Sequence, residues 1–416
     1  MKNNIIIKNA NQLVTSSGFE AKKGSQMNDL GIIEDGCVVI TDGIIEKVGK
    51  TKEVLKDFDM LGYEVIDATG KAVLPGFVDS HTHFIFGGYR DEEFNLRLKG
   101  ATYTEISKAG GGIVSTVTNT RNATEDELVK SGLKRLDSML NFGVTTVEGK
   151  SGYGLDRDTE IKQLEVMEIL DDIHPLDIVR TYMGAHEVPV DYKGRTDEFV
   201  DFLVNEALEE IKEKDLAEFC DIFTEEGVFD IKQSRRVLSK AKELGFKLKM
   251  HADEIVPIGG AELAAEMGCV SADHLLKASD KGLEDMKNNN VVATLLPTTA
   301  FSLKEDFARG RYIIDNGGIV ALASDYNPGS SHTNSIPLII ALATIYMNMT
   351  IEETITALTL NAAAALDREK EIGSLDIGKK GDLIILDAPR YNFLSYTIGV
   401  NLVKTVVKDG YVVLDK

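Results

Sequence analysis

The chain has 416 residues, 43% of them hydrophobic, which is longer than the roughly 150–250 residues of one ordinary domain. Its 46 basic and 67 acidic residues give a formal net charge of −21 without a basic cluster, which argues against a nucleic-acid partner. No apolar run approaches the roughly 18 residues of a membrane span, so we expect a cytoplasmic protein with no membrane partner. Three scattered cysteines without CxxC spacing predict neither disulfides nor a thiolate zinc site.

Both ends of the chain predict short strands joined by tight turns. Residues 36–50 contain the hairpin signal D-G and residues 63–73 contain T-G, and residues 378–390 and 405–415 have the same character. Neither end has enough strands for a stable sheet alone, so we expect both to pair into one small composite β-sandwich. The predicted division is then 1–74 and 372–416 for the sandwich and 75–371 for a larger domain between them.

In the larger domain, short β-rich apolar runs alternate with segments of helical periodicity. This alternation predicts a parallel α/β sheet. The expected strands lie within residues 72–83, 143–150, 178–187, 218–227, 247–254, 270–275, 291–297 and 319–329. The expected helices are 125–141, 158–172, 195–213, 231–244, 259–267 and 278–289. Eight strands with helices between most of them predict a (β/α)₈ TIM-type barrel.

The connection after the first barrel strand is long, about 60 residues. It contains three consecutive glycines at 110–112, which permit a close backbone approach to a ligand. A flexible surface loop is the simpler interpretation, but its place at the expected active face favours a role in covering the substrate.

Polar side chains gather at the expected carboxyl ends of the barrel strands, where such barrels carry their chemistry. His81 and His83 are one residue apart, so both leave the first strand on the same side and can converge on one point. Five of the seven histidines lie at strand ends. The polar residues there are His81, His83, His186, Glu187, His251, Asp253, Glu254, Asp273, His274 and Asp325.

This concentration predicts a metal centre, although each histidine alone is more often an ordinary polar residue. Nitrogen and carboxylate ligands without thiolates suit Zn²⁺, Fe²⁺ or Mn²⁺, and a catalytic site leaves one position open for water. His81, His83, His251 and Asp325 would form such a site. For His174 and His332, which lie in a connection and in the loop after the eighth strand, we expect structural roles.

The order of these residues resembles the amidohydrolase superfamily of metal-dependent hydrolases over nearly the whole chain. Within it, "GFVDSHTHFIFGGYR", "GKSGYGL", "GAHEVP", "HADE", "SADHL" and "SDYNPGS" resemble the imidazolonepropionase family. The resemblance implies His81, His83, His251 and Asp325 as metal ligands, with His274 close by, and a homodimer. Many members carry a carboxylated lysine on strand four, but "EFCDIFTEEG" has none, which points to one metal ion, Zn²⁺ or Fe²⁺.

The resemblance implies hydrolysis of the ring amide of 4-imidazolone-5-propanoate to N-formimidoyl-L-glutamate, the third step of L-histidine degradation. Asp325 can accept a proton from the attacking water, and Glu254 is the candidate that protonates the leaving nitrogen. His274 would stabilise the tetrahedral intermediate. The proton route among these three catalytic candidates stays open.

The substrate carries a propionate, which a guanidinium fork holds best, and Arg90 near the barrel mouth could supply it. A surface ion pair with residues 91–93 is the structural alternative. Tyr103 could add a hydroxyl to the same carboxylate. The resemblance implies ring contact at Tyr153 and a hydrogen bond from His186 to the imidazolone carbonyl. Three residues after strand eight would contact the amino-acid end, namely Asn327, Gly329 and Ser330.

Two other functions remain open. Another cyclic amidohydrolase, or a deaminase of amino-heterocycles, would use the same strand-end residues, but it would leave Arg90 and Tyr103 unexplained. A non-catalytic barrel used as a scaffold is the alternative from another class. It is disfavoured because unpaired polar groups retained at one face without a metal would cost free energy.

Overall fold

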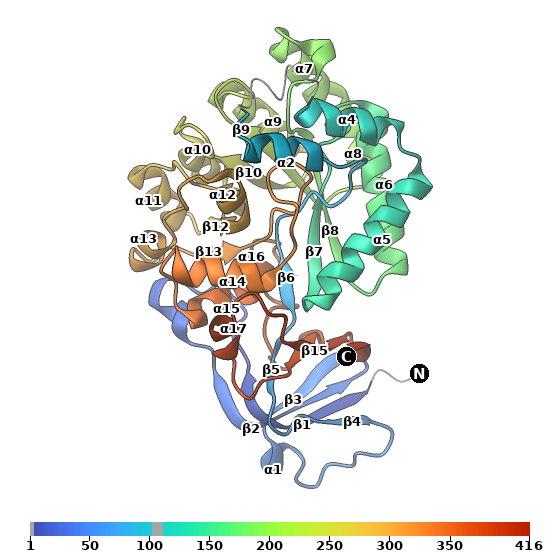
Figure 1. Ribbon diagram of the computed structural model, residues 1–416, viewed down its shortest axis with the longest axis vertical. Coiled ribbons are helices and arrows are strands. Elements are labelled where there is room, and N and C mark those ends of the chain that lie inside the picture. Colours follow the sequence, from blue (N-terminus) through green and yellow to red (C-terminus); the bar gives the residue numbers. More distant parts are fainter. Residues whose placement is uncertain (1–3, 102–110) are drawn as a thin grey trace.

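The computed structural model describes residues 4–101 and 111–416. It has two parts, a barrel of parallel strands and a smaller β-domain that lies below it in Figure 1. Helices ring the barrel, whereas the first and last strands of the chain lie together in the smaller part (Figure 1).

The barrel has the eight parallel strands predicted from the sequence, and each pairs with the next along the chain. They are β6 (Phe77–Asp79), β7 (Val144–Lys150), β8 (Asp177–Ala185), β9 (Phe219–Thr224), β10 (Lys247–Ala252), β11 (Ser271–His274), β12 (Val292–Leu295) and β13 (Val320–Leu322). The ring closes beyond the ends of β6 and β13. There the His83 N–H donates to the Tyr326 carbonyl at 2.9 Å, and the Asp325 N–H donates to the His81 carbonyl at 3.0 Å. Closure therefore brings the two predicted ligand segments side by side.

Amphipathic helices cover the barrel strands, and the six predicted helices are confirmed within a few residues. They are α5 (Glu125–Asn141), α6 (Arg157–Ile173), α7 and α8 (Thr196–Phe202 and Leu208–Glu213) with a π-helical turn at Leu203–Ala207 between them, α9 (Ile231–Glu243), α10 (Gly260–Met267) and α11 (Asp280–Asn288). A capping box begins α5, because Thr124 Oγ1 accepts from the Glu127 N–H at 3.2 Å while Glu127 Oε2 accepts from the Thr124 N–H at 2.9 Å.

Further helices lie in the connections that follow β6, β12 and β13 and at the two ends of the chain. They are α1 (Thr51–Val54), α2 (Asp91–Leu98), α4 (Ile113–Asn122), α12 (Pro297–Leu303), α13 (Gly310–Asp315), α14 (Ile336–Ile345), α15 (Ile351–Leu358), α16 (Leu360–Ala364) and α17 (Phe393–Tyr396), with 3₁₀ turns at Gly24–Asn28 and Val190–Tyr192. Within the described residues, no helix is long and apolar enough to cross a membrane. All three cysteines are free and buried.

The two chain ends combine into one β-domain, as predicted. Its strands are β1 (Ile5–Val14), β2 (Ile32–Thr41), β3 (Ile44–Lys50), β4 (Glu64–Asp67), β5 (Ala72–Pro75), β14 (Leu383–Leu386), β15 (Val403–Lys408) and β16 (Tyr411–Asp415). The two ends meet where β14 pairs antiparallel with β5. All eight strands belong to one continuous hydrogen-bonded sheet rather than to two separate sheets, and side chains from both chain ends share one apolar core. The domain bounds drawn from the sequence stay a prediction.

Two local predictions were wrong. The run "AVLPGFVD" is not one strand: β5 belongs to the terminal sheet and β6 to the barrel, with Gly76 between them. A Cβ at Gly76 would lie 2.3 Å from Thr145 Oγ1, so only glycine fits where the chain changes sheet. The T-G signal at Thr69 and Gly70 joins no hairpin, because β4 and β5 both pair parallel with β1. The D-G turn at Asp42 and Gly43 does join the predicted hairpin of β2 and β3.

Candidate active site

Three of the predicted ligand histidines converge at the carboxyl end of the barrel. The ring atoms that His81, His83 and His251 could offer to a metal all lie within 4.8 Å of one another. The Nε2 atoms of His83 and His251 are 3.3 Å apart, and all three side chains are buried. Burial lowers the pKa of His81 and His83 well below the usual value, so these rings are neutral.

The tautomers of these rings fit a bound metal. In each ring Nδ1 faces an oxygen that can only accept a proton, so Nδ1 carries the hydrogen and Nε2 keeps its lone pair. The partners are Asp273 Oδ2 at 2.6 Å for His81, the Ser151 carbonyl at 3.4 Å for His83 and Asp221 Oδ2 at 3.1 Å for His251. The contact between Asp221 and His251 is at ion-pair distance but does not have the geometry of a hydrogen bond. Three imidazole nitrogens that gather at one buried place are the kind of donor set that a divalent cation requires.

Asp325 completes the set that the sequence predicted. Its Oδ1 lies 3.5 Å from His81 Nε2, which has no hydrogen-bond partner in the described part of the chain. Its Oδ2 accepts a hydrogen bond from Thr299 Oγ1 at 2.6 Å. Burial raises the pKa of Asp325 to about 6. The backbone of Asp325 has a φ of 48°, a left-handed conformation that costs free energy outside glycine and is typical of functional sites.

The two other catalytic candidates, Glu254 and His274, lie next to each other beside the ligands. His274 Nδ1 is 3.5 Å from Glu254 Oε1, and the His274 ring centroid is 5.0 Å from that of His251. Burial, aided by the nearby charge of Asp325, raises the pKa of Glu254 to about 8. A carboxyl with this pKa is protonated at neutral pH and can donate a proton.

Tyr153 and His186 line the same centre from β7 and β8. The rings of His186 and His83 stack with centroids 4.7 Å apart, and the Tyr153 ring is 5.3 Å from His186. His186 Nδ1 lies 3.0 Å from the Gly152 carbonyl, to which it must donate. Burial lowers the pKa of His186 to about 3, so its free Nε2 is a hydrogen-bond acceptor here, whereas the sequence predicted a donor to the substrate carbonyl.

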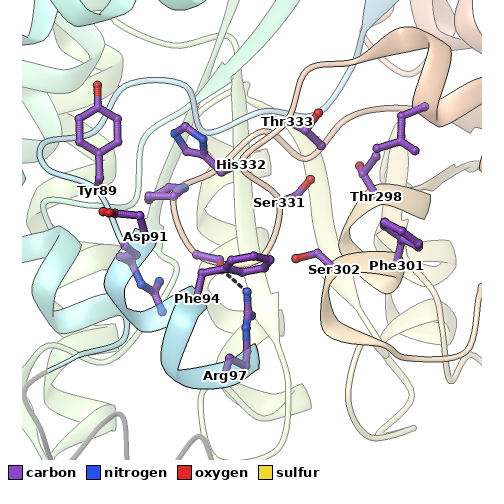
Figure 2. Close-up of a pocket in the computed structure, with 14 residues that line it drawn as sticks. Tyr89, Asp91, Phe94, Arg97, Thr298, Phe301, Ser302, Ser331, His332 and Thr333 are labelled. Carbon is purple, nitrogen blue, oxygen red and sulfur yellow. Dashed lines mark hydrogen bonds between the residues drawn. The ribbon is translucent and has the colours of Figure 1, made fainter. Parts of the chain in front are cut away.

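A cavity of about 580 Å³ lies at the barrel mouth, and His81, His83 and His251 are not among the residues that line it. Arg90 and Gly329 line it, and the guanidinium lies so close to Gly329 that a Cβ there would be 2.3 Å from an Arg90 terminal nitrogen. Figure 2 shows Arg97 extending from α2 toward the same loop, where it donates to the Gly329 carbonyl at 3.4 Å. Arg90 and Arg97 both line the cavity, so it has two guanidinium groups in its wall.

Asn327 holds the loop after β13 together. Its Oδ1 accepts from the backbone N–H groups of Gly329 and Ser330, both at 2.8 Å, and its Nδ2 donates to the Asp325 carbonyl at 2.7 Å. Its amide is therefore engaged within the loop that carries the aspartate. The substrate contacts predicted for Asn327, Gly329 and Ser330 stay predictions, and Tyr103 lies outside the described residues.

Several residues at the site were not found from the sequence. Arg97 and His332 line the cavity, and Thr299 positions Asp325. Charged residues fill the barrel interior below the histidines, among them Lys150 and Lys249, both fully buried. The sequence contains a pattern that could have indicated them. Glu148 and Lys150 are two residues apart on one strand, as are Lys249 and His251 on another, so each pair points to the same side of its strand.

A (β/α)₈ barrel with histidines and an aspartate at its strand ends defines a class of metal-dependent hydrolase. The model of the amidohydrolase family matches residues 72–413, and the chain belongs to that family. It is 60% identical over 415 residues to the imidazolonepropionase of Clostridium tetani, covering 100% of this chain and 99% of the relative. It is 56% identical over 406 residues to that of Parabacteroides distasonis, with 98% of each covered. Within the amidohydrolases, the chain is therefore a member of the imidazolonepropionase family.

Solved structures confirm the fold at much lower identity. An adenosine deaminase from Xanthomonas campestris with bound zinc superposes with a TM-score of 0.71 at 16% identity, covering 99% of this chain and 93% of that one. A 5-methylcytosine deaminase from Klebsiella pneumoniae gives 0.73 at 18% identity, covering 99% and 98%. Barrel and β-domain thus recur together in enzymes that are otherwise distant in sequence.

Proposed function

We propose that the chain hydrolyses the ring amide C–N bond of 4-imidazolone-5-propanoate to N-formimidoyl-L-glutamate, the third step of L-histidine degradation. The observation that carries the proposal is a buried set of metal ligands beside a cavity faced by the guanidinium groups of Arg90 and Arg97. The names of the most similar relatives support the same reaction.

One divalent metal ion, Zn²⁺ or Fe²⁺, would be held by His81, His83, His251 and Asp325. When bound, such an ion lowers the pKa of a water molecule and polarises the carbonyl under attack. The neutral rings described above are ready to receive it, because their Nδ1 hydrogens already face acceptors. Their orientation therefore does not have to be set at the time of metal binding.

The protein side chains move the protons. Asp325 takes a proton from the water whose oxygen forms a bond to the ring carbonyl carbon, while Thr299 holds its other carboxylate oxygen at 2.6 Å. The ring C–N bond then breaks, and the leaving nitrogen takes a proton from Glu254. The raised pKa of Glu254, about 8, keeps that proton available at neutral pH. His274, whose Nδ1 is 3.5 Å from Glu254 Oε1, would hydrogen-bond to the oxygen of the carbonyl under attack.

The arginines of the cavity support one orientation of the substrate, with its propionate at the cavity wall. Arg90 uses Nε to bind Glu93 Oε2 at 2.9 Å, which leaves its terminal nitrogens for the propionate. Arg97 adds a second positive charge at the same wall. Tyr153 and His186 contact the ring plane, with His186 Nε2 able to accept a hydrogen bond from a ring N–H. A substrate without a carboxylate, such as that of a base deaminase, would leave the terminal nitrogens of Arg90 and the Arg97 guanidinium without a substrate group to bind.

The ultraviolet absorbance of freshly generated 4-imidazolone-5-propanoate tests this function. Metal-replete protein should accelerate the loss of absorbance well above the spontaneous decay of the ring, and chelation should abolish the acceleration. Ammonia release from amino-heterocycles, with no effect on imidazolone propionate, would replace the proposal by the deaminase alternative.

For the quaternary structure we propose the homodimer that the family resemblance implies. Exposed apolar side chains at the carboxyl ends of the neighbouring helices α14 and α17, and just after them, support a protein contact there, because such groups are unusual together on a monomer surface. They include Tyr346, Tyr396 and Ile398. Light scattering should give twice the 45.5 kDa mass of the chain. The cytoplasmic location stays a prediction.

A further inference from the structure

A layer of five charged residues fills the barrel directly below the metal ligands. All of their side chains are fully buried, and they come from four barrel strands, β7 and the three consecutive strands β9, β10 and β11. They are Glu148, Lys150, Asp221, Lys249 and Asp273. Fully buried charges are costly unless they are paired, so the pairing in this layer has to be close to complete.

Lys150 is the centre of the layer. Its ammonium group lies 2.7 Å from Asp221 Oδ2, 3.0 Å from Glu148 Oε1 and 3.5 Å from Asp273 Oδ2. Lys249 binds the other oxygen of Glu148 at 2.7 Å and the Ser80 carbonyl at 3.0 Å. Each carboxylate in the layer therefore has a lysine as a direct partner, and three carboxylates converge on one ammonium group.

The same carboxylates contact the metal ligands from below. Asp273 Oδ2 is 2.6 Å from His81 Nδ1, and Asp221 Oδ2 is 3.1 Å from His251 Nδ1. In both histidines these contacts direct Nε2 toward the metal centre. Two of the three ligand histidines are thus oriented by carboxylates that Lys150 holds in place.

The cage around Lys150 has the composition of a cation site. Ligand atoms of His81, Glu148 and Asp273 lie within 4.8 Å of one another, which is close enough to hold a metal ion. Two lysines against three carboxylates leave this layer with a net charge of only −1, whereas without Lys150 it would be −2. The ammonium group therefore supplies the positive charge that a second ion would otherwise bring.

We propose that Lys150 takes the place of a second metal ion: its ammonium group fills the carboxylate cage, keeps the centre mononuclear and holds Asp221 and Asp273 against the two ligand histidines. Lys150 is thus a positioning residue that acts through these carboxylates. The inference rests on the metal centre of the proposed function but not on its substrate, so metal binding tests it apart from activity.

Two substitutions separate the two effects of the lysine. Lys150→Met keeps the volume and removes the charge, so the aspartates lose their partner and the affinity for one metal should fall about 10- to 100-fold, as for other groups that orient metal ligands. Lys150→Ala also opens space inside the cage, so a second ion should enter. Lys379→Met is the matched control, because Lys379 is equally buried and lies in the terminal β-domain, where its Nζ donates to the carbonyls of Gly18 and Ile372.

The experiment is a titration of metal-free full-length protein with Co²⁺, followed by its visible absorption and by metal analysis after gel filtration. Wild type and Lys379→Met should bind one ion per chain with the same spectrum and affinity. Lys150→Met should bind one ion more weakly, and Lys150→Ala should bind two. A single ion per chain in Lys150→Ala, or wild-type affinity in Lys150→Met, would overturn the proposal.

A measurement on the unmodified chain covers the case in which the variants do not fold. In metal-free protein with nitrogen-labelled histidine, long-range proton–nitrogen spectra report which ring nitrogen carries the hydrogen. His81 and His251 should both be in the Nδ1–H form before any metal is added. A mixture of tautomers, or the Nε2–H form, would show that the charged layer does not orient them and would overturn the proposal.

Discussion

Replacing Arg90 should weaken the binding of 4-imidazolone-5-propanoate without affecting the metal centre. The side chain is only 16% exposed, and Nε is already used by Glu93, so its two terminal nitrogens are available to the propionate. Arg90→Met removes both of these bonds, whereas Arg90→Lys keeps the positive charge but loses the planar fork.

The structure sets the expected size of the effect. A hydrogen bond to a charged group contributes about 1.5–3 kcal/mol. Since 1.4 kcal/mol corresponds to a factor of ten, loss of one such bond lowers kcat/KM about 10- to 150-fold. Arg90→Met loses two, so its kcat/KM should fall by at least that factor. The change should be mainly in KM, because the propionate is bound equally in the ground and transition states. Arg90→Lys should show a smaller defect.

The assay is the initial rate of loss of ring absorbance over a range of substrate concentrations, with the metal content of each variant measured in parallel. Glu93→Gln is a useful control, because it leaves the guanidinium and an acceptor oxygen in place and removes only the negative charge of the partner. If Arg90→Met retains the wild-type KM at full metal occupancy, Arg90 does not bind the propionate and the assignment of the cavity is refuted.

Four further outcomes are expected. Gly329→Ala should raise KM severalfold with an unchanged Tm, because the new Cβ would lie 2.3 Å from the movable end of Arg90; an unchanged KM would contradict this. Arg97→Met should raise KM by a smaller factor than Arg90→Met, measured in the same assay. Glu254→Gln should lower kcat about 10²- to 10⁴-fold. In wild type the rate should fall as pH rises through about 8, where Glu254 loses its proton, and pH–rate profiles of the variant should lack this limb. Chelation should lower the Tm and Zn²⁺ should restore it, because a ligand that binds only the folded state stabilises it; calorimetry that finds no shift would argue against a bound metal.

Much of the barrel could be predicted from the sequence because its strands are short, apolar and bounded by turn residues. The ligands could be predicted for the same reason: parallel strands in a barrel bring their carboxyl ends to one face, so His81, His251 and Asp325 had to lie near one another. The distances between them depend on closure of the barrel, where the His83 N–H donates to the Tyr326 carbonyl. That contact joins segments far apart in the chain, so the sequence alone does not give the distances.

Other features depend on partners that the sequence alone does not specify. The change of sheet at Gly76 depends on β14, which pairs with β5 and comes some 300 residues later. Judged by residue type alone, the side chains of Lys150 and Lys249 would be expected to lie exposed at the protein surface. Their burial is possible only because carboxylates on the adjacent strands neutralise them. The contact between His186 Nδ1 and the Gly152 carbonyl was likewise not predicted, because it joins the loop after β7 to the end of β8.

The most direct test of the central claim is mass spectrometry of the product formed in water labelled with a heavy isotope of oxygen. Hydrolysis of the ring amide predicts N-formimidoyl-L-glutamate with one heavy oxygen atom in its new carboxylate and no ammonia released during turnover. A product without the label, or one formed with release of ammonia, would contradict attack by water on the ring carbonyl.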